Sequence, residues 1–230
     1  MEASKRCVKD VTCLRKFIDI ANACIELGHW PLHFKVSMSI IIPKPNKESY
    51  DSLKDFRPII LLNTISKLIE KVIGERLQFQ SISNKFIYQC QLEDLKQQST
   101  TDAGVMLTHF IYTGWVKNLS TSTLAFDIAQ FFPSLNHQLL SLILFKASFD
   151  PKILLFFKDY LVGKKTRYFW NNFSSPSFNV DVRVGQGSAL STILSILYLS
   201  PLLYIFEKQL KNLKIPVSIL SFINDRLFIA

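Results

Sequence analysis

The sequence of 230 residues lacks the cysteine and histidine spacings that are typical of metal sites. Its four cysteines show no CxxC spacing and have no paired histidines nearby, so neither a zinc site nor a disulfide framework is indicated. An apolar stretch is also missing at the N-terminus, where MEASKRCVKD is charged, and we therefore expect no secretion signal. Both absences favour a reducing intracellular location, nuclear or cytoplasmic.

Internal repeats and low-complexity linkers are likewise absent from the sequence. With 48% apolar and 20% charged residues, the chain can bury a sizeable core in one domain or two closely packed subdomains, which argues against disorder. The net charge of +9 is spread along the chain rather than held in a tail. This balance is compatible with a partner that carries phosphate groups.

One long uncharged run, between Arg183 and Glu207, imitates a membrane span. It contains Gln186, four serines and Pro201, which favours a buried core helix over a transmembrane helix. We therefore expect no membrane association.

Periodicity predicts a mixture of helices and strands. Helices are expected over 5–27, from Asn63 or Thr64, after the STTD stretch, and over NHQLLSLILFKA, DPKILLFFKDYLVG and SALSTILSILYLSPLLYIFEKQL. Strands are expected over 36–42, in STLAFDI, in KTRYFWNNF and SFNVDVRVG as a hairpin, and at the C-terminal end. Asp150 and Pro151 are typical of a helix start, and Gly28 and Gly163 of helix ends. The alternation predicts an α+β or mixed architecture with a division near residue 120.

Acidic residues are scarce in the second half of the chain, and two of them are unusual. Asp127 lies in an otherwise apolar strand, where a solitary carboxylate is costly unless it is paired, hydrogen-bonded or bound to metal. Asp225 lies in a short polar turn between two apolar runs, where a simple turn is the alternative explanation. Two carboxylates at neighbouring strand ends could hold Mg²⁺, which typically takes one or two protein carboxylates.

Four stretches carry a resemblance to a known family: KPNKESYDSLKDFRPIILLNTISKLIEKVIGERL, LAFDIAQFFPSL, VGQGSALSTIL and SFINDRLFI. In order and approximate separation they are similar to the reverse transcriptase domain of non-LTR (LINE-type) retrotransposons, and the match runs from about Trp30 to Ala230. The most specific signatures are RPI-x-LLNT-x-SKL-x-EK and QGS-x-LS. The resemblance implies a right-hand polymerase fold, with a fingers-like region and N-terminal helix over 1–120 and a palm-like region over 121–230 that ends at the metal-binding hairpin.

The resemblance implies a metal site for Mg²⁺, with Mn²⁺ as an alternative. Asp127 falls where the palm's first metal-binding Asp belongs, and Ile128 where a backbone carbonyl assists. The family's terminal hairpin carries two adjacent Asp residues. Here Asn224 stands at the first of these positions, and Asp225 remains at the second.

The resemblance also implies substrate contacts by residues that are less distinctive on their own: for the incoming nucleotide Lys44, Arg57, Phe132 and Gln186, and for template and primer Gly187 and Ser188. Plainer roles stay open for some of them. Phe132 can be ordinary core, Ser188 can be the N-cap of the helix that follows, and Lys47 and Lys54 share the loop of Lys44.

The function implied is template-directed addition of deoxynucleotides to a primer 3′-hydroxyl, with an RNA template, a DNA primer and deoxynucleoside triphosphates as partners. Several departures predict weak or absent activity: Asn224 lacks a charge, Ala189 and Thr192 stand where the family has proline, and Glu93-Asp94 replaces a glycine pair. Because the chain stops five residues after Asp225, we also expect a truncated, mutated element copy without thumb, endonuclease or zinc knuckle.

Two other functions remain open at the level of sequence. One is a catalytically inactive domain that still binds RNA or an RNA:DNA hybrid through a basic cleft. The other is a basic membrane-associated protein that uses residues 188–206 as an anchor.

Overall fold

The computed structural model describes residues 10–92, 95, 98–128, 131–180, 187–213, 217–222 and 225–229. Their α-helices are α2 (Val11–Glu26), α3 (Thr64–Ser83), α4 (Thr100–Val116), α5 (Phe131–Ser134), α6 (His137–Lys146), α7 (Pro151–Tyr160) and α8 (Ser191–Asn212). The 3₁₀ turns are η1 (Leu32–Lys35) and η2 (Leu53–Asp55). The strands are β1 (Val36–Pro43), β2 (Phe56–Leu61), β3 (Thr123–Asp127), β4 (Lys165–Trp170), β5 (Phe173–Ser174), β6 (Phe178–Asn179), β7 (Ser218–Phe222) and β8 (Asp225–Ile229). The mixed α+β class is therefore confirmed.

Helix starts follow local capping chemistry, as the sequence predicts. The side chain of Asp150 accepts a hydrogen bond from the Lys152 N–H at the start of α7, with proline at the first helical position. Ser99 and Asp102 form a capping box at the start of α4, in which each side chain accepts from the other residue's backbone N–H. These bonds satisfy N–H groups that have no partner within the helix.

One sheet joins strands from distant parts of the sequence. Its main path has the order β2-β1-β4-β5, with β6 also paired to β4. The β1–β2 pairing is antiparallel, whereas β1 and β4 are parallel, with Val36 opposite Lys165. The strand over 56–61 is not predicted by the sequence pattern. Pro58 lies within β2, which is tolerated because β2 forms the edge of the sheet.

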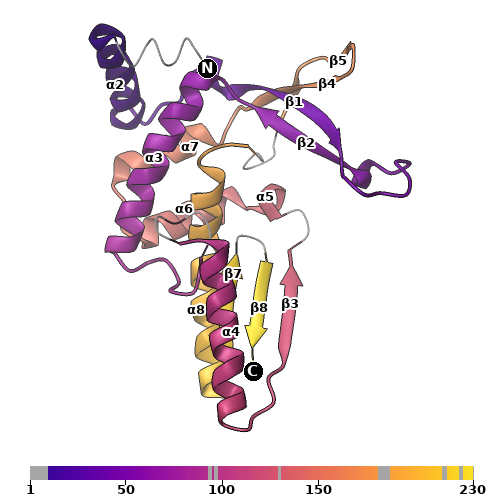
Figure 1. Ribbon diagram of the computed structural model, residues 1–230. Helices are drawn as coiled ribbons and strands as arrows, with labels where there is room; N and C mark the ends of the chain where they lie inside the picture. Colours follow the sequence, from indigo (N-terminus) through magenta and orange to yellow (C-terminus); the bar gives the residue numbers. More distant parts are fainter. Residues whose placement is uncertain are drawn as a thin grey trace.

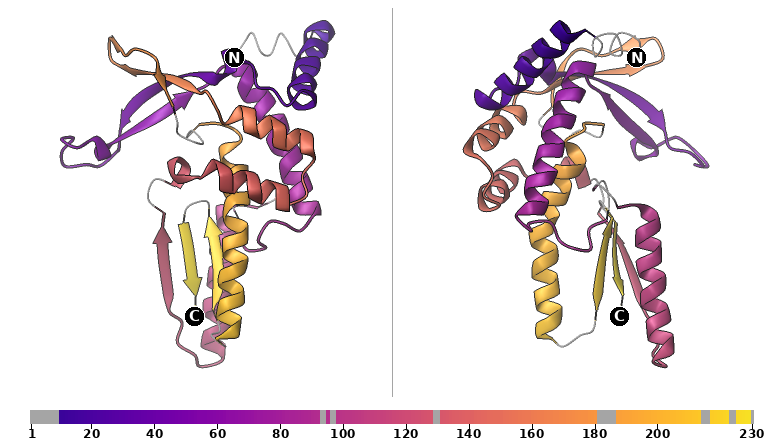
Figure 2. Two further views of the ribbon diagram at one scale, coloured as in Figure 1. Left: turned by 180° about the vertical axis from the view of Figure 1, so that it is seen from behind. Right: turned by 60° about the vertical axis from the view of Figure 1, so that its left-hand side comes forward.

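A second sheet, of order β3-β8-β7, is antiparallel throughout. Figure 2 shows it between two long helices, with α8 on one side and α4 on the other. Leu220 and Ile229 belong to a cluster against which α4 packs Leu107 and Phe110. On the opposite face Ile219 packs with Leu203 of α8. The first sheet joins strands from both sides of residue 120, because β4 pairs with β1, and α4, which precedes residue 120, packs on the second sheet (Figure 1).

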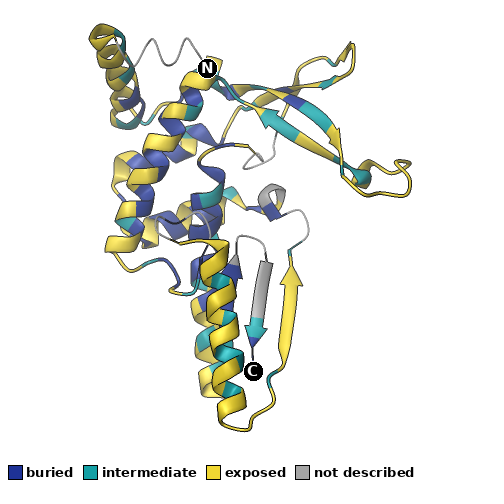
Figure 3. Cartoon of the chain, in the orientation of Figure 1, coloured by how far each residue is buried: buried dark blue, intermediate teal, exposed yellow. Residues whose placement is uncertain are grey.

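The main core lies where α2, α3, α6, α7 and α8 meet, and Figure 3 shows the buried residues gathered there. Trp30 is buried in this core, with its ring against Phe156 and Tyr160. The core therefore lies between the two sheets. It holds together the helices that support both of them.

Helix α8 is, within the described ranges, the one helix long and apolar enough to cross a membrane by length and composition. Nine of its residues are buried, among them Leu194 and Leu197 of the main core. Such burial is typical of the central helix of a packed domain, and length and apolar composition alone are weak evidence for a membrane span.

Candidate active site

Two acidic residues singled out by the sequence lie opposite each other in the second sheet. β3 ends at Asp127 and β8 begins at Asp225, and the antiparallel register pairs these two residues directly. The expectation that they lie on adjacent strands of one sheet is confirmed for the backbone. The Asp127 side chain is exposed, the structure describes the backbone of Asp225, and Asn224 lies outside the described residues.

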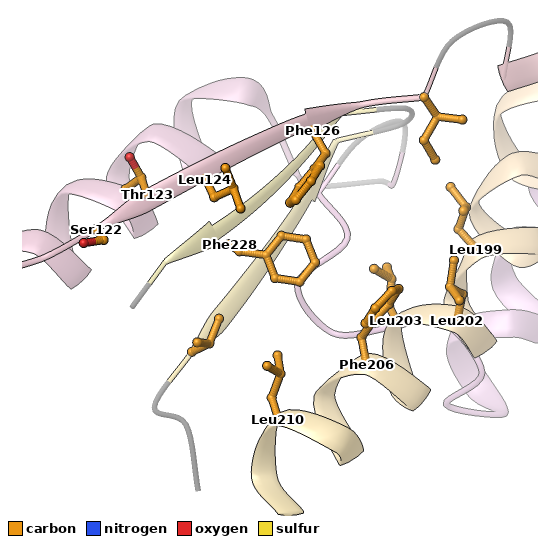
Figure 4. A pocket seen from close by; sticks show the side chains of 12 residues that line it. Ser122, Thr123, Leu124, Phe126, Leu199, Leu202, Leu203, Phe206, Leu210 and Phe228 are labelled. Atoms are coloured by element: carbon orange, nitrogen blue, oxygen red, sulfur yellow. The ribbon is translucent and has the colours of Figure 1, made fainter. Parts of the chain in front are cut away.

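Asp127 belongs to the sheet face that points away from an apolar pocket. This pocket, of about 540 Å³, lies between the sheet and α8, and Figure 4 shows Leu124, Phe126 and Phe228 directed into it. Because successive residues of a strand point to opposite faces, Asp127 lies on the other face. The rings of Phe126 and Phe228 meet edge to face with centroids 5.3 Å apart, which fastens β3 to β8 just below the acidic pair.

The donor atoms at this strand end suit a hard cation. The described residues contain no group of three or more His, Cys, Asp or Glu side chains that could enclose a metal ion. Mg²⁺ does not need one, since it usually binds one or two carboxylates and takes its remaining oxygens from water and substrate phosphates. The residue types at this strand end, two aspartates and the carbonyl of Ile128, which follows Asp127, are oxygen donors of the kind that Mg²⁺ prefers, whereas zinc prefers nitrogen and sulfur ligands.

Two basic residues come together on the β1–β2 hairpin. The register pairs Ile42 with Arg57 and ends at Pro43 and Phe56. The Lys44 N–H donates to the Asp55 carbonyl oxygen over 2.8 Å, which extends the pairing by one more residue on each strand. Lys44 and Arg57 are therefore diagonal neighbours on one face of the hairpin. In Figure 1 and the left view of Figure 2, this hairpin extends toward the side on which β3 forms the edge of the second sheet.

Lys47, another lysine of this loop, is less suited to bind a ligand. The Nζ of Lys47 lies 3.8 Å from the Oδ1 of Asp55, in an ion pair. Over the described part of the chain, Lys44 and Arg57 form no such pair, and Arg57 is exposed. Their juxtaposition is an observation, whereas their contact with a triphosphate stays a prediction.

The turn at Gly187 packs tightly against the first sheet. Gly187 has a φ of +113°, and a Cβ at this position would lie 2.7 Å from the carbonyl oxygen of Ile60 in β2. Glycine is required here both by the backbone angle and by this close approach. Gln186, the residue before it, lies outside the described residues, and so do Glu93 and Asp94.

The sequence interpretation of Ser188 as the N-cap of the following helix is wrong in detail. α8 begins at Ser191 with Leu190 in the cap position. The Ser188 hydroxyl accepts from the Leu190 N–H at 3.1 Å, and its carbonyl oxygen accepts from the Ser191 N–H at 3.3 Å. Ser188 thus closes a turn that precedes the helix, because serine hydroxyls bond as readily in such turns as in caps.

Glu70 is a buried polar residue that the sequence analysis did not single out. It lies on α3 with 1% exposure and accepts three hydrogen bonds: from the Tyr160 hydroxyl at 2.9 Å, the Ser188 hydroxyl at 2.8 Å and the Ala189 N–H at 3.0 Å. A signal was present, because Glu70 falls within the buried stripe of α3 between Ile69 and Ile73. A carboxylate in such a stripe requires specific partners.

Lys164, just before β4, lies beside this carboxylate. Its Nζ stands 3.7 Å from the ring centroid of Tyr160, a cation–π contact. Burial lowers the pKa of Lys164 to about 8, the Glu70 carboxylate opposes the change, and Lys35 adds to it. Glu70 and Lys164 line one small cavity of about 20 Å³, enough for about one water molecule.

Phe132 is the remaining predicted site residue. The structure describes its backbone within α5, and its side chain lies outside the description. Its role at the incoming nucleotide stays a prediction, as does that of Gln186.

Comparison with known proteins gives a consistent result. Residues 42–230 match the family described as "Reverse transcriptase (RNA-dependent DNA polymerase)". A probable RNA-directed DNA polymerase from transposon X-element of Drosophila melanogaster is 27% identical over 188 residues, which cover 78% of this chain and 20% of the relative. The RNA-directed DNA polymerase from mobile element jockey, also of D. melanogaster, is 27% identical over 184 residues, covering 79% of this chain and 20% of the relative.

A structural neighbour extends the agreement to the fold. The apo telomerase of Candida tropicalis truncated from its C-terminal domain superposes with a TM-score of 0.61 at 16% identity, over 86% of this chain and 44% of the telomerase. The chain spans about a fifth of the length of the two transposon relatives.

Proposed function

The chain belongs to the reverse transcriptase (RNA-dependent DNA polymerase) family and is related to the polymerases of non-LTR retrotransposons, and on that premise we propose that it holds a primer, an RNA template and a deoxynucleoside triphosphate at the Asp127–Asp225 strand pair. The β1–β2 hairpin then belongs to the fingers and the β3-β8-β7 sheet to the palm. This function places the protein inside the cell, in the nucleus or cytoplasm.

The observation that carries this proposal is the β3–β8 register. Two residues more than ninety positions apart, each predicted as a metal ligand, are direct partners at one end of a sheet. Directly opposite residues of antiparallel strands have Cβ atoms about 4.5–5.5 Å apart on the same face, where like charges repel unless a cation lies between them. A bound cation would therefore offset the repulsion of the Asp127–Asp225 pair.

The ligands we assign to this cation are the carboxylates of Asp127 and Asp225 and the carbonyl oxygen of Ile128. When bound, Mg²⁺ or Mn²⁺ supplies activation of the primer 3′-hydroxyl and stabilisation of the pyrophosphate leaving group. Family members in general use divalent metal. Asn224 offers a neutral oxygen where the resemblance has a charged one, which weakens the hold on the ion.

The basic hairpin binds the triphosphate in this proposal. Arg57 presents a planar guanidinium suited to two phosphate oxygens, and Lys44 a mobile point charge. The diagonal arrangement on one face of β1–β2 supports their joint action on a single ligand. Phe132 and Gln186 are assigned to the sugar and base of the same nucleotide, and the Gly187–Ser188 turn to the template and primer.

Primer extension tests the catalytic part of the proposal. Asn224→Asp, in a chain fused to the segment that follows this region in the X-element relative, should raise nucleotide incorporation at least about tenfold. Replacing the lost charge recovers part of a transition-state stabilisation of about 3–4 kcal/mol, and each 1.4 kcal/mol is about tenfold in rate. Mn²⁺ should partly rescue the fusion that keeps Asn224.

The fusion without the Asn224 change is the matched control, and Asp127→Ala added to Asn224→Asp should abolish the gain. If Asn224→Asp yields no increase while the protein stays folded and binds duplex, the assignment of the defect to Asn224 is wrong. The defect would then be assigned to Ala189, Thr192 or the Glu93-Asp94 pair.

A second candidate function is binding of RNA or an RNA:DNA hybrid without chemistry, which the net charge of +9 and the neutral Asn224 favour. Affinity for a primer–template should then fall steeply with salt and depend little on sequence, because phosphate contacts release counterions. Arg57→Ala should weaken nucleotide binding about tenfold and duplex binding less, since a charged hydrogen bond is worth about 1.5–3 kcal/mol. Equal losses for both ligands would show that Arg57 does not contact the triphosphate.

A further inference from the structure

The turn at Gly187–Ala189 is held by the carboxylate of Glu70, which lies on α3. Both oxygens of Glu70 are used: Oε1 accepts from the Tyr160 hydroxyl, and Oε2 accepts from the Ser188 hydroxyl and the Ala189 N–H. The Tyr160 and Ser188 hydroxyls are also 3.0 Å apart, so the three side chains form a closed network. Tyr160 and Ser188 are buried with Glu70.

This network connects the two ends of the proposed site. Gly187 touches β2, the strand that carries Arg57, through the carbonyl oxygen of Ile60. Ser188 and Ala189, the next two residues, are bound to α3, which follows β2 in the chain. The turn is thus fixed between two contacts, one with β2 and one with Glu70 of α3.

The bond from Ala189 depends on this chain's own sequence. Proline, which the resemblance has at this position, carries no N–H to donate. Ala189 therefore gives Glu70 a donor that a proline could not supply, and the carboxylate holds backbone as well as side chain.

We propose that Glu70 is a positioning residue, which sets the backbone of the Gly187–Ala189 turn and through it the fit of template and nucleotide. It acts through the turn and does not touch the substrates itself. Lys164 lines the same small cavity as Glu70, and their opposite charges attract each other. The statement that the turn faces substrate depends on the proposed function, whereas the hold of Glu70 on the turn does not.

Hydrogen exchange tests that hold without any substrate. In Glu70→Ala the amides of Ala189 and Leu190 should exchange about tenfold faster, because the bonds that close the turn are lost, while the capping-box amide of Asp102 in α4 should be unchanged. Glu70→Gln keeps one acceptor oxygen for Ser188 and Ala189, and it should exchange within about threefold of the original protein. Glu75→Gln, at an exposed position five residues further along α3, is the matched control, and its Ala189 and Leu190 amides should exchange as those of the original protein do.

Equilibrium binding to a blocked primer–template, with and without a deoxynucleoside triphosphate, gives the second measurement. Glu70→Ala should weaken nucleotide affinity about tenfold, with rescue in Glu70→Gln, since a displaced turn loses contacts of that size. If Glu70→Ala does not fold, Ser188→Ala removes one donor to the carboxylate and should speed the exchange of Ala189, whose N–H is bonded to Glu70. Faster exchange of Leu190 alone would reflect only the loss of its own bond to the Ser188 hydroxyl.

The outcomes separate the two proposals. Unchanged exchange of Ala189 in a folded Glu70→Ala or Ser188→Ala protein overturns the positioning role. Faster exchange with nucleotide affinity unchanged also overturns it, because the turn then does not serve the substrate. Failure of the original protein to bind either primer–template or nucleotide overturns the proposed function, while the exchange result still decides whether Glu70 holds the turn.

Discussion

Replacement of Gly187 by alanine should be among the most damaging single-methyl changes in the protein. Two independent effects add at this position. The φ of +113° is a conformation that residues with a side chain rarely adopt, and such strain costs about 1–3 kcal/mol. The added Cβ would also lie 2.7 Å from the Ile60 carbonyl oxygen, closer than Cβ atoms approach, and relief by backbone movement costs about 1–3 kcal/mol more.

The expected total loss for Gly187→Ala is about 2–6 kcal/mol of the free energy of unfolding. Urea denaturation measures it as a fall in midpoint at constant slope. The contacting atom is the backbone carbonyl oxygen of Ile60, in a strand paired to β1, so rotation of a side chain cannot relieve the contact. Either β2 or the turn must move, and nucleotide affinity should fall with stability.

Two other glycines provide matched controls. Gly163 also has a positive φ, of +70°, but a Cβ there would meet nothing within 4 Å, so Gly163→Ala should cost only the backbone strain of about 1–2 kcal/mol. Gly74, inside α3, has its nearest neighbours at 3.6 Å, and Gly74→Ala should stabilise the helix by about 0.5–1 kcal/mol. If Gly187→Ala and Gly163→Ala lose the same stability, the contact with Ile60 carries no energy and the reasoning is refuted.

Two pH-dependent predictions follow from two half-buried charged side chains, Asp159 and Lys164. Burial raises the pKa of Asp159, but hydrogen bonds from Lys35 and the Trp30 N–H outweigh this effect and leave the pKa below the ordinary 3.8. The ionised carboxylate therefore stabilises the fold above pH 3.8, and this stabilisation is lost as the pH falls below it. In Asp159→Asn the free energy of unfolding, measured by urea titration, should fall less steeply over this acid range. Lys164 has its pKa lowered by burial from 10.5 to about 8, so the unfolded chain binds more protons between these values, and stability should rise from pH 8 to 10.5 in the original protein but not in Lys164→Met. If the free energy of unfolding depends on pH in either variant as it does in the original protein, the replaced residue does not cause that pH dependence.

Local signals in the sequence predicted much of the secondary structure. The starts of α4 and α7 were predicted because Ser99, Asp102 and Asp150 act on N–H groups two or three residues away. The direct pairing of Asp127 with Asp225 agrees with the family resemblance, which concerns arrangement beyond any local pattern.

Relations between distant residues were not predictable from the sequence. The hairpin expected over residues 165–185 is divided in its described part, residues 165–180, where β4 pairs with both β5 and β6 after a reversal at Asn171, whose φ is +51°. The parallel β1–β4 pairing had no signal, because register between strands of distant segments is set by packing. The burial of Glu70 also depends on partners from α7 and the 188–189 turn, which only the fold brings together.

The parallel pairing of β1 with β4 also has a consequence for how the chain is made. The hydroxyl of Ser37 donates to the carbonyl oxygen of Lys165, 128 residues later. At roughly 5–20 residues per second, a ribosome needs on the order of 10 s to supply β4 after it has released β1. During that interval the inner edge of β1, which includes Met38 and Ile40, has no neighbour and can pair with any extended chain nearby. Slow translation beyond residue 61 should therefore favour aggregation of the nascent chain over its completion.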